Sequence, residues 1–209
     1  MSQPALAAVT TAEAIREQAA LLFFERGYDA TTLRQVAAAV GIKVSSLYNH
    51  IDSKEQLLLS VMGGVMDDLL ALQKVAVSRD MDVIDRLIAV LDCHIRFSAS
   101  RAREVFIGNA ELRSLPTDAR AKVIAKRREY ERRIQDLIVE AGEQGKAEVL
   151  DARLHTYSIV AKGTHVASWY KPAGALSMDR IINIYAKAAL RELSVNDADT
   201  RVDGWPAAA

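Results

Sequence analysis

Apolar residues recur at helical spacing along most of the chain. Within residues 11–26 they stand at i, i+4, i+7 and i+8, which predicts an amphipathic helix. The same test predicts an all-α protein of about nine helices and finds no convincing strand. After 11–26, the predicted helices cover about 32–40, 43–50, 53–76, 81–100, 102–113, 117–144, 151–170 and 177–193.

Local signals mark the helix ends near the N-terminus. Thr32 stands three residues before Gln35, and Ser53 three residues before Gln56, so both pairs predict capping boxes. The N–H groups at these helix starts are also candidates to bind phosphates. Gly41 separates two short helices by a tight turn, which places the second across the first in a helix-turn-helix arrangement.

The charge balance restricts the function. Lys and Arg total 27, Asp and Glu also total 27, and the formal net charge is zero. A generally basic nucleic-acid binder is therefore not indicated, and any DNA contact must come from locally placed charges. The single Cys93 excludes an internal disulfide framework and a Cys-rich zinc site, and we predict no metal or other cofactor.

Nothing in the sequence indicates export or a membrane. The first residues, MSQPALAAVTT, lack the basic start and the long apolar run of a signal peptide. No window approaches the roughly 18 uninterrupted apolar residues of a membrane-spanning helix. We therefore expect a cytoplasmic protein with no membrane partner.

The second helix of the predicted helix-turn-helix, around VSSLYNH, carries side chains that suit DNA. The hydroxyl of Ser46 can donate to or accept from several bases, and the amide of Asn49 can pair with adenine. Tyr48, His50 and Lys54 can reach phosphates. The alternative is that these side chains serve only as helix caps, core or surface.

Residues 15–57 resemble the DNA-binding domain of the TetR/AcrR family of regulators. The matching features keep their spacing throughout: Ala19-Ala20, Phe23, Gly27, Thr31-Thr32, Val36-Ala37, Gly41-Ile42, Leu47-Tyr48, His50 and Ser53-Lys54-Glu55. The chain departs from the family pattern at Lys43, where a Ser or Thr cap is usual, and at Ile51, where Phe is usual. The resemblance implies that Thr32, Tyr48, His50 and Lys54 hold the DNA backbone, and that Lys43, Ser45, Ser46 and Asn49 face bases or nearby phosphates.

The resemblance also implies a domain division and a homodimer. Residues 1–53 would form the DNA-binding domain, residues 54–196 a ligand-binding and dimerisation domain, and residues 197–209 a flexible tail. A two-fold dimer would set two recognition helices about 34 Å apart, which matches successive major grooves of a palindromic operator. Small or apolar positions of the last two predicted helices are the candidates for the dimer interface: Gly163, Ala167, Ile181, Ile184, Tyr185 and Ala188.

Two later stretches, ELRSLP at 111–116 and THVASWYKPAGALSMDRIINIYAKAAL at 164–190, resemble a branch of the family with a Trp-Tyr-(Arg/Lys)-Pro-x-Gly motif. Several regulators of that branch respond to acyl-coenzyme A thioesters, which implies a thioester or fatty-acid effector. The basic run over 113–133 is either a solvated helix face or a patch for the phosphates of coenzyme A. The ligand candidates, each of which could also be ordinary core or surface, are Met62, Met66, His94, Phe97, Phe106, Asn109, Arg113, Tyr130 and Ile134.

Other classes of protein explain the sequence less well. His94, His155 and His165 stand in no catalytic or metal-binding spacing, so an enzyme is not indicated. A helical lipid- or drug-binding sensor or scaffold would explain residues 54–209 but not the N-terminal resemblance. We therefore expect a DNA-binding regulator that a small effector releases from its operator, and we favour a repressor because that is the habit of the family.

Overall fold

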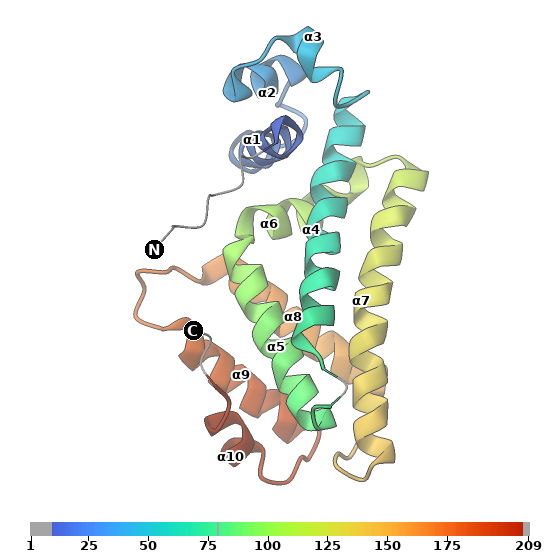
Figure 1. Cartoon of the computed structure of the whole chain (residues 1–209), viewed down its shortest axis with the longest axis vertical. Helices are drawn as coiled ribbons and strands as arrows, with labels where there is room; N and C mark the ends of the chain where they lie inside the picture. Colours follow the sequence, from blue (N-terminus) through green and yellow to red (C-terminus); the bar gives the residue numbers. More distant parts are fainter. Residues whose placement is uncertain (1–9, 79, 207–209) are drawn as a thin grey trace, which may run out of the picture.

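This computed structural model describes residues 10–78 and 80–206 of the chain. That part contains ten α-helices and one short 3₁₀ helix, and no strand (Figure 1). The all-α prediction is thus confirmed. None of these described helices combines the length and the apolar character needed to cross a membrane. In chain order the elements are α1 (Thr11–Arg26), α2 (Leu33–Val40), α3 (Val44–Leu47), α4 (Lys54–Ala76), α5 (Val83–Ser100), α6 (Ala102–Ala110), η1 (Leu112–Ser114), α7 (Thr117–Glu143), α8 (Ala152–Trp169), α9 (Met178–Glu192) and α10 (Ala198–Asp203).

The N-terminal helices begin where side chains cap them. Thr32 Oγ1 accepts the N–H of Gln35 at 3.3 Å and Gln35 Oε1 accepts the N–H of Thr32 at 2.8 Å, which confirms the first predicted capping box. The Thr32 N–H is therefore occupied rather than free for a phosphate. Ser53 caps α4 through the N–H of Gln56, but the Gln56 side chain turns to the N–H of Asp52, so the second box is incomplete.

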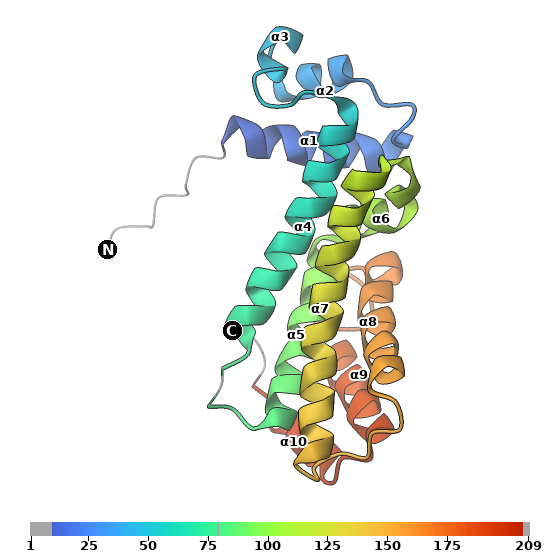
Figure 2. The ribbon, with the colours of Figure 1, turned by 90° about the vertical axis from the view of Figure 1, so that its right-hand side faces the viewer.

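Helix α4 joins two apolar cores. Its first half contributes Leu57 to a core shared with α1, α2 and α3, and its second half contributes Leu69 to the core of the C-terminal bundle. In that bundle α5 packs against α8, and α7 packs against both α4 and α8 (Figure 2). Ile107 of α6 and Val123 of α7 belong to the N-terminal core. The two halves of the chain are therefore joined by shared apolar packing and not by a linker.

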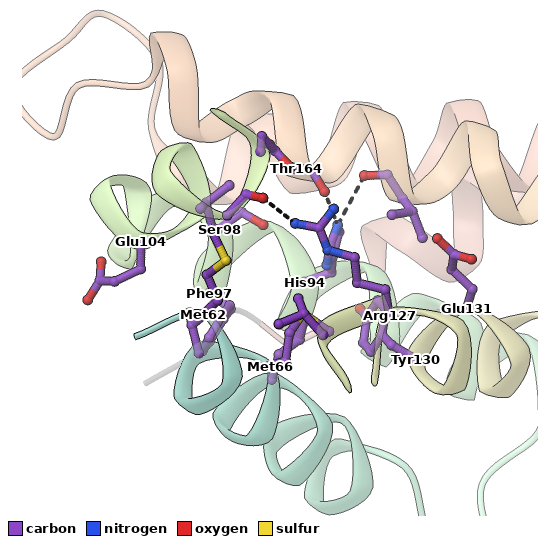
Figure 3. Close-up of a pocket in the computed structure, with 17 residues that line it drawn as sticks. Met62, Met66, His94, Phe97, Ser98, Glu104, Arg127, Tyr130, Glu131 and Thr164 are labelled. Carbon is purple, nitrogen blue, oxygen red and sulfur yellow. Dashed lines mark hydrogen bonds between the residues drawn. The ribbon is translucent and has the colours of Figure 1, made fainter. Parts of the chain in front are cut away.

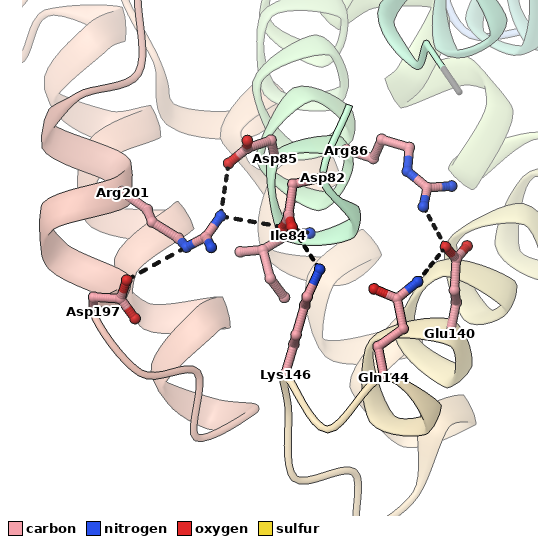
Figure 4. A network of polar contacts seen from close by, with 9 residues as sticks. All are labelled: Asp82, Ile84, Asp85, Arg86, Glu140, Gln144, Lys146, Asp197 and Arg201. Atoms are coloured by element: carbon pink, nitrogen blue, oxygen red, sulfur yellow. Dashed lines mark hydrogen bonds and ion pairs between the residues drawn. The ribbon is translucent and has the colours of Figure 1, made fainter. Parts of the chain in front are cut away.

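The C-terminal segment is folded, which corrects the prediction of a flexible tail from residue 197. Helix α10 places two apolar side chains in the main core. Arg201 on this helix donates to Asp82 at 3.2 Å and to Asp85 at 3.1 Å (Figure 4). These partners stand 119 and 116 residues away along the chain, so the local sequence could not reveal them. Residues 207–209 of the predicted tail lie outside the described residues.

Candidate functional site

The turn between α2 and α3 determines how α3 is presented. Gly41 adopts the left-handed conformation, with φ 78°, and the N–H of Ile42 reaches back to the carbonyl of Ala37 at 3.0 Å. A side chain at this φ would be strained, which explains the glycine. Leu47 of α3 is fully buried in the N-terminal core. Anchored in this way, α3 lies at one end of the molecule, far from the C-terminal bundle (Figures 1 and 2).

The side chains predicted to contact DNA gather at this end. Helix α3 is shorter than the predicted 43–50, and a turn continues it, with the N–H of His50 donating to the carbonyl of Leu47 at 2.9 Å. Tyr48 is 53% exposed, so it does not serve as core. Lys43 stands at the cap position of α3 without a side-chain hydrogen bond. All the predicted residues are exposed or half-buried: Thr32, Lys43, Ser45, Ser46, Tyr48, Asn49, His50 and Lys54.

Lys54 is held near the start of α4 by contacts within the protein. Its Nζ donates to the carbonyl of Asp29 at 3.2 Å and lies 4.2 Å from the centre of the Tyr28 ring. Burial raises the pKa of Tyr28 to about 12, so the ring stays neutral beneath the ammonium group. The backbone N–H of Tyr28 in turn donates to Glu111 Oε1 at 3.4 Å. These contacts therefore link the end of the molecule that carries α3 to the segment that follows α6.

A small chamber lies inside the C-terminal bundle, about 160 Å³ in volume. Side chains of α4, α5, α6, α7 and α8 line it, and most are apolar (Figure 3). Its polar lining includes Ser98 and Thr164, which were not predicted from the sequence, and Arg127, which belongs to the predicted basic run. Six of the predicted ligand residues do line it: Met62, Met66, His94, Phe97, Asn109 and Tyr130.

His94 is fully buried in the wall of this chamber and uncharged. Burial lowers the pKa of His94 to about 4. Its Nε2 lies 3.2 Å from the carbonyl oxygen of Val160 and 3.2 Å from Thr164 Oγ1 (Figure 3). Because a carbonyl only accepts, Nε2 carries the proton and Nδ1 keeps a free lone pair. The His94 ring stacks on Tyr130, and both Nδ1 and the Tyr130 hydroxyl are buried without a hydrogen-bond partner among the described residues.

Gly163 provides the space that His94 needs. A Cβ at Gly163 would lie 2.2 Å from Cδ2 of His94, closer than real Cβ contacts come. The close helix approach that Gly163 permits thus occurs between α8 and α5 of the same chain. Ile181 is also buried within the subunit, whereas Ile184 is 49% exposed. Ala167, Tyr185 and Ala188 are half-buried.

Arg127 projects its guanidinium into the chamber wall from α7. Its Nη2 donates to the carbonyl of Gly108 on α6 at 2.6 Å (Figure 3). Desolvation lowers the pKa of Arg127, although the negative charge of Glu131 acts in the opposite sense. Within the predicted basic run, this is the side chain that faces the chamber. Arg113 lies exposed on η1 and lines neither the chamber nor the groove beside it, so the structure does not bring it to the ligand candidates.

An open groove of about 1160 Å³ adjoins the chamber between α6 and α8. The two spaces share lining residues, including Asn109 and Glu131. Phe106 lines the groove rather than the chamber and packs edge-on against Phe24 of α1, with ring centroids 5.2 Å apart. Ile134, another ligand candidate, is buried in the main core and lines neither space. A molecule could therefore extend from the chamber into the groove.

The fold and these features define a class: a helix-turn-helix protein whose C-terminal bundle holds a cavity. The family "Bacterial regulatory proteins, tetR family" matches residues 15–61, and the family "Tetracyclin repressor-like, C-terminal domain" matches residues 80–193, more than half of the chain. The chain belongs to the TetR family, as the resemblance in its sequence indicated.

Individual relatives agree with this assignment. The chain is 28% identical over 178 residues to the HTH-type transcriptional repressor KstR2 of Rhodococcus jostii, covering 84% of this chain and 87% of that protein. A tetR-family regulatory protein from Rhodococcus RHA1 has a TM-score of 0.84 at 26% identity, covering 90% of this chain and 99% of that one. AibR in complex with isovaleryl coenzyme A and operator DNA has a TM-score of 0.76 at 28% identity, covering 83% and 95% of the two chains.

Proposed function

We propose that this protein is a homodimeric transcriptional repressor that binds a palindromic operator and leaves it when a coenzyme A thioester occupies the bundle. The observation that carries the proposal is the pairing of an outward-facing α3, anchored through Leu47, with a cavity beside the middle of α4, the helix that follows α3. Family membership supports regulation rather than catalysis. Action on the chromosome would place the protein in the cytoplasm.

The assignment of roles at the DNA follows from side-chain chemistry and exposure. Tyr48, His50 and Lys54, together with the N–H groups that follow Thr32 in the first turn of α2, would bind the phosphate backbone and set the register. Ser45 and Ser46 on α3 and Asn49 in the turn that follows it would read base edges, and Lys43 would meet a base or a nearby phosphate. Residues 1–53 would form the reading domain, and the sensing domain would begin at residue 54 and extend beyond residue 196 to include α10.

The dimer would form through exposed faces of α8 and α9. Ile184 is an exposed large apolar side chain on α9, and Tyr157 and Trp169 are exposed on α8. Ala167, Tyr185 and Ala188 remain candidates beside them, whereas Gly163 and Ile181 pack within the subunit. Two helices from each subunit would then bury an apolar surface that a single chain leaves in water.

The effector class rests on the shape of the cavity and on relatives. Isovaleryl coenzyme A is bound by AibR, a structural neighbour of this chain. A chamber of about 160 Å³ matches a compact acyl group, since a cavity of about 150 Å³ binds benzene. The open groove would take the pantetheine portion. A compact or branched acyl group suits a chamber of this volume better than a long chain does.

Release from DNA would follow from movement of α6 and α4. Both helices line the chamber, and α6 also touches α1 through Phe106 and Phe24. An effector shifts DNA binding only if it favours the conformation that cannot bind the operator. Filling the chamber would move these helices and change the separation of the two α3 helices in the dimer.

The test is retention of the protein on DNA from upstream of its own gene. Fluorescence anisotropy should detect a palindromic site bound by two chains, with affinity that falls as salt rises. Lys54→Ala should weaken binding to every variant of the site about equally and reduce the salt slope by about one, while Asn49→Ala should alter base preference. Binding of apolar ligands without any retention on such DNA would instead support the helical lipid- or drug-sensor alternative.

A further inference from the structure

Arg127 differs from the other basic side chains of α7 that face the bundle. Lys126 pairs with Asp67 at 2.5 Å, and Arg133 pairs with Glu129 at 2.8 Å. Arg127 has no ion pair within residues 10–78 and 80–206, and its recorded hydrogen bond goes to the neutral carbonyl of Gly108. A guanidinium has five N–H donors, so Arg127, which lines the chamber, keeps donors beyond the one that binds Gly108.

An unpaired cation in a half-buried site is costly and demands an acceptor. Removing a charge from water without a partner opposes folding, and Arg remains protonated under almost all conditions. The lowered pKa of Arg127 records this desolvation. The chamber is otherwise mostly apolar, so an oxygen atom of a bound molecule would replace the lost solvent.

The charges around Arg127 indicate which kind of oxygen fits. Glu131 lines the chamber one turn along α7 from Arg127, and its negative charge acts on the guanidinium. Glu104 also lines the chamber but is paired with Arg101 at 3.1 Å. A further carboxylate beside Arg127 would be repelled by Glu131, whereas a neutral carbonyl accepts a hydrogen bond without adding charge. The lining therefore favours an ester or thioester over the corresponding free acid.

The present partner of Arg127 connects the chamber to the DNA-binding end. Gly108 lies in the last turn of α6, where helix carbonyls have no partner within the helix. The same helix places Ile107 in the N-terminal core and sets Phe106 against Phe24 of α1. The Arg127–Gly108 bond thus fastens α7 to the element that supports the reading domain.

We propose that Arg127 recognises the carbonyl oxygen of the effector and gives up the Gly108 carbonyl to do so. This inference rests on the proposed function and specifies the residue and the chemical group through which the effector acts. Ligand binding then removes a tie between α7 and α6, and α6 carries the change to α1.

The first experiment measures binding without DNA. Titration calorimetry with isovaleryl coenzyme A would compare the wild type, Arg127→Met and the matched control Arg128→Met, whose side chain is exposed on the same helix. Loss of a hydrogen bond to a charged group should weaken binding about ten- to hundredfold in Arg127→Met. Arg128→Met should bind as the wild type does. Circular dichroism would establish that both variants fold.

The outcomes separate this inference from the proposed function. Equal affinity of Arg127→Met and wild type for the thioester, or no binding by the wild type, overturns the role of Arg127 even if the operator is bound. Isovalerate that binds as tightly as the thioester contradicts the preference for a neutral carbonyl. In anisotropy without ligand, Arg127→Met should bind the operator severalfold more weakly, because the tie to Gly108 is absent. Unchanged operator affinity would exclude the tie.

Discussion

The N-terminal and C-terminal halves of this chain differ in how completely side chains fill their interiors. The core of the reading domain is filled by fully buried apolar side chains such as Phe23 and Leu47, and the buried hydroxyl of Thr31 there donates to the carbonyl of Gly27 at 2.9 Å. The bundle instead contains a chamber whose wall holds His94 and Tyr130 with unpaired polar atoms. A filled core keeps one geometry, whereas an unfilled one leaves room for a ligand to select another. The division suits a rigid reader joined to an adjustable sensor.

The largest expected effect is loss of the proposed dimer when its apolar surface on α9 is changed. Ile184→Asp should abolish the proposed dimer, because a carboxylate buried there without a partner costs about 3–5 kcal/mol. The individual subunit should retain its helical content, since Ile184 is 49% exposed. Light scattering and circular dichroism would measure the two properties.

The control introduces an aspartate at an exposed apolar residue outside α8 and α9. Val75 on α4 is 84% exposed and lies outside α8 and α9, so Val75→Asp should leave the dimer intact. An intact Ile184→Asp dimer, or a Val75→Asp protein that dissociates, would show that the interface lies on another face.

The next prediction compares added bulk in the two cores. Ala37 is fully buried in the reading domain, so Ala37→Leu should lower the free energy of unfolding by about 1–3 kcal/mol. Val160 borders the chamber, so the extra methylene in Val160→Leu can enter empty space and should cost less than about 1 kcal/mol. Urea unfolding gives both values. Equal destabilisation by the two substitutions would contradict the contrast between a filled and an unfilled core.

A smaller effect follows from the neutral His94. Burial lowers the pKa of His94 from 6.5 to about 4. On acidification His94 therefore binds a proton in the unfolded chain before it does so in the folded chain. The stability is full above pH 6.5 and falls as the pH drops toward about 4, by at most about 1.4 kcal/mol per pH unit. His94→Gln should remove this part of the pH dependence in urea unfolding. A variant with the wild-type slope would show that His94 does not cause it.

The sequence predicted the reading domain well because its signals are local. The capping pair Thr32 and Gln35 and the turn at Gly41 act over three or four residues, and the structure has each of them. The sensing domain depends on contacts that are distant along the chain. Gly163 had the spacing of a dimer contact, yet its neighbour is His94. Arg127 could not be distinguished within the basic run, because only the rotation of α7 turns it toward the chamber.

Release of the wild-type protein from its own operator is the most direct test of the coupling between the chamber and α3. Anisotropy of a labelled palindromic DNA fragment would be followed while isovaleryl coenzyme A, free coenzyme A or isovalerate is added. We predict that the thioester releases the DNA, and that coenzyme A and isovalerate at the same concentration release much less. If the DNA stays bound while calorimetry shows that the thioester binds the protein, this coupling between the chamber and α3 is contradicted.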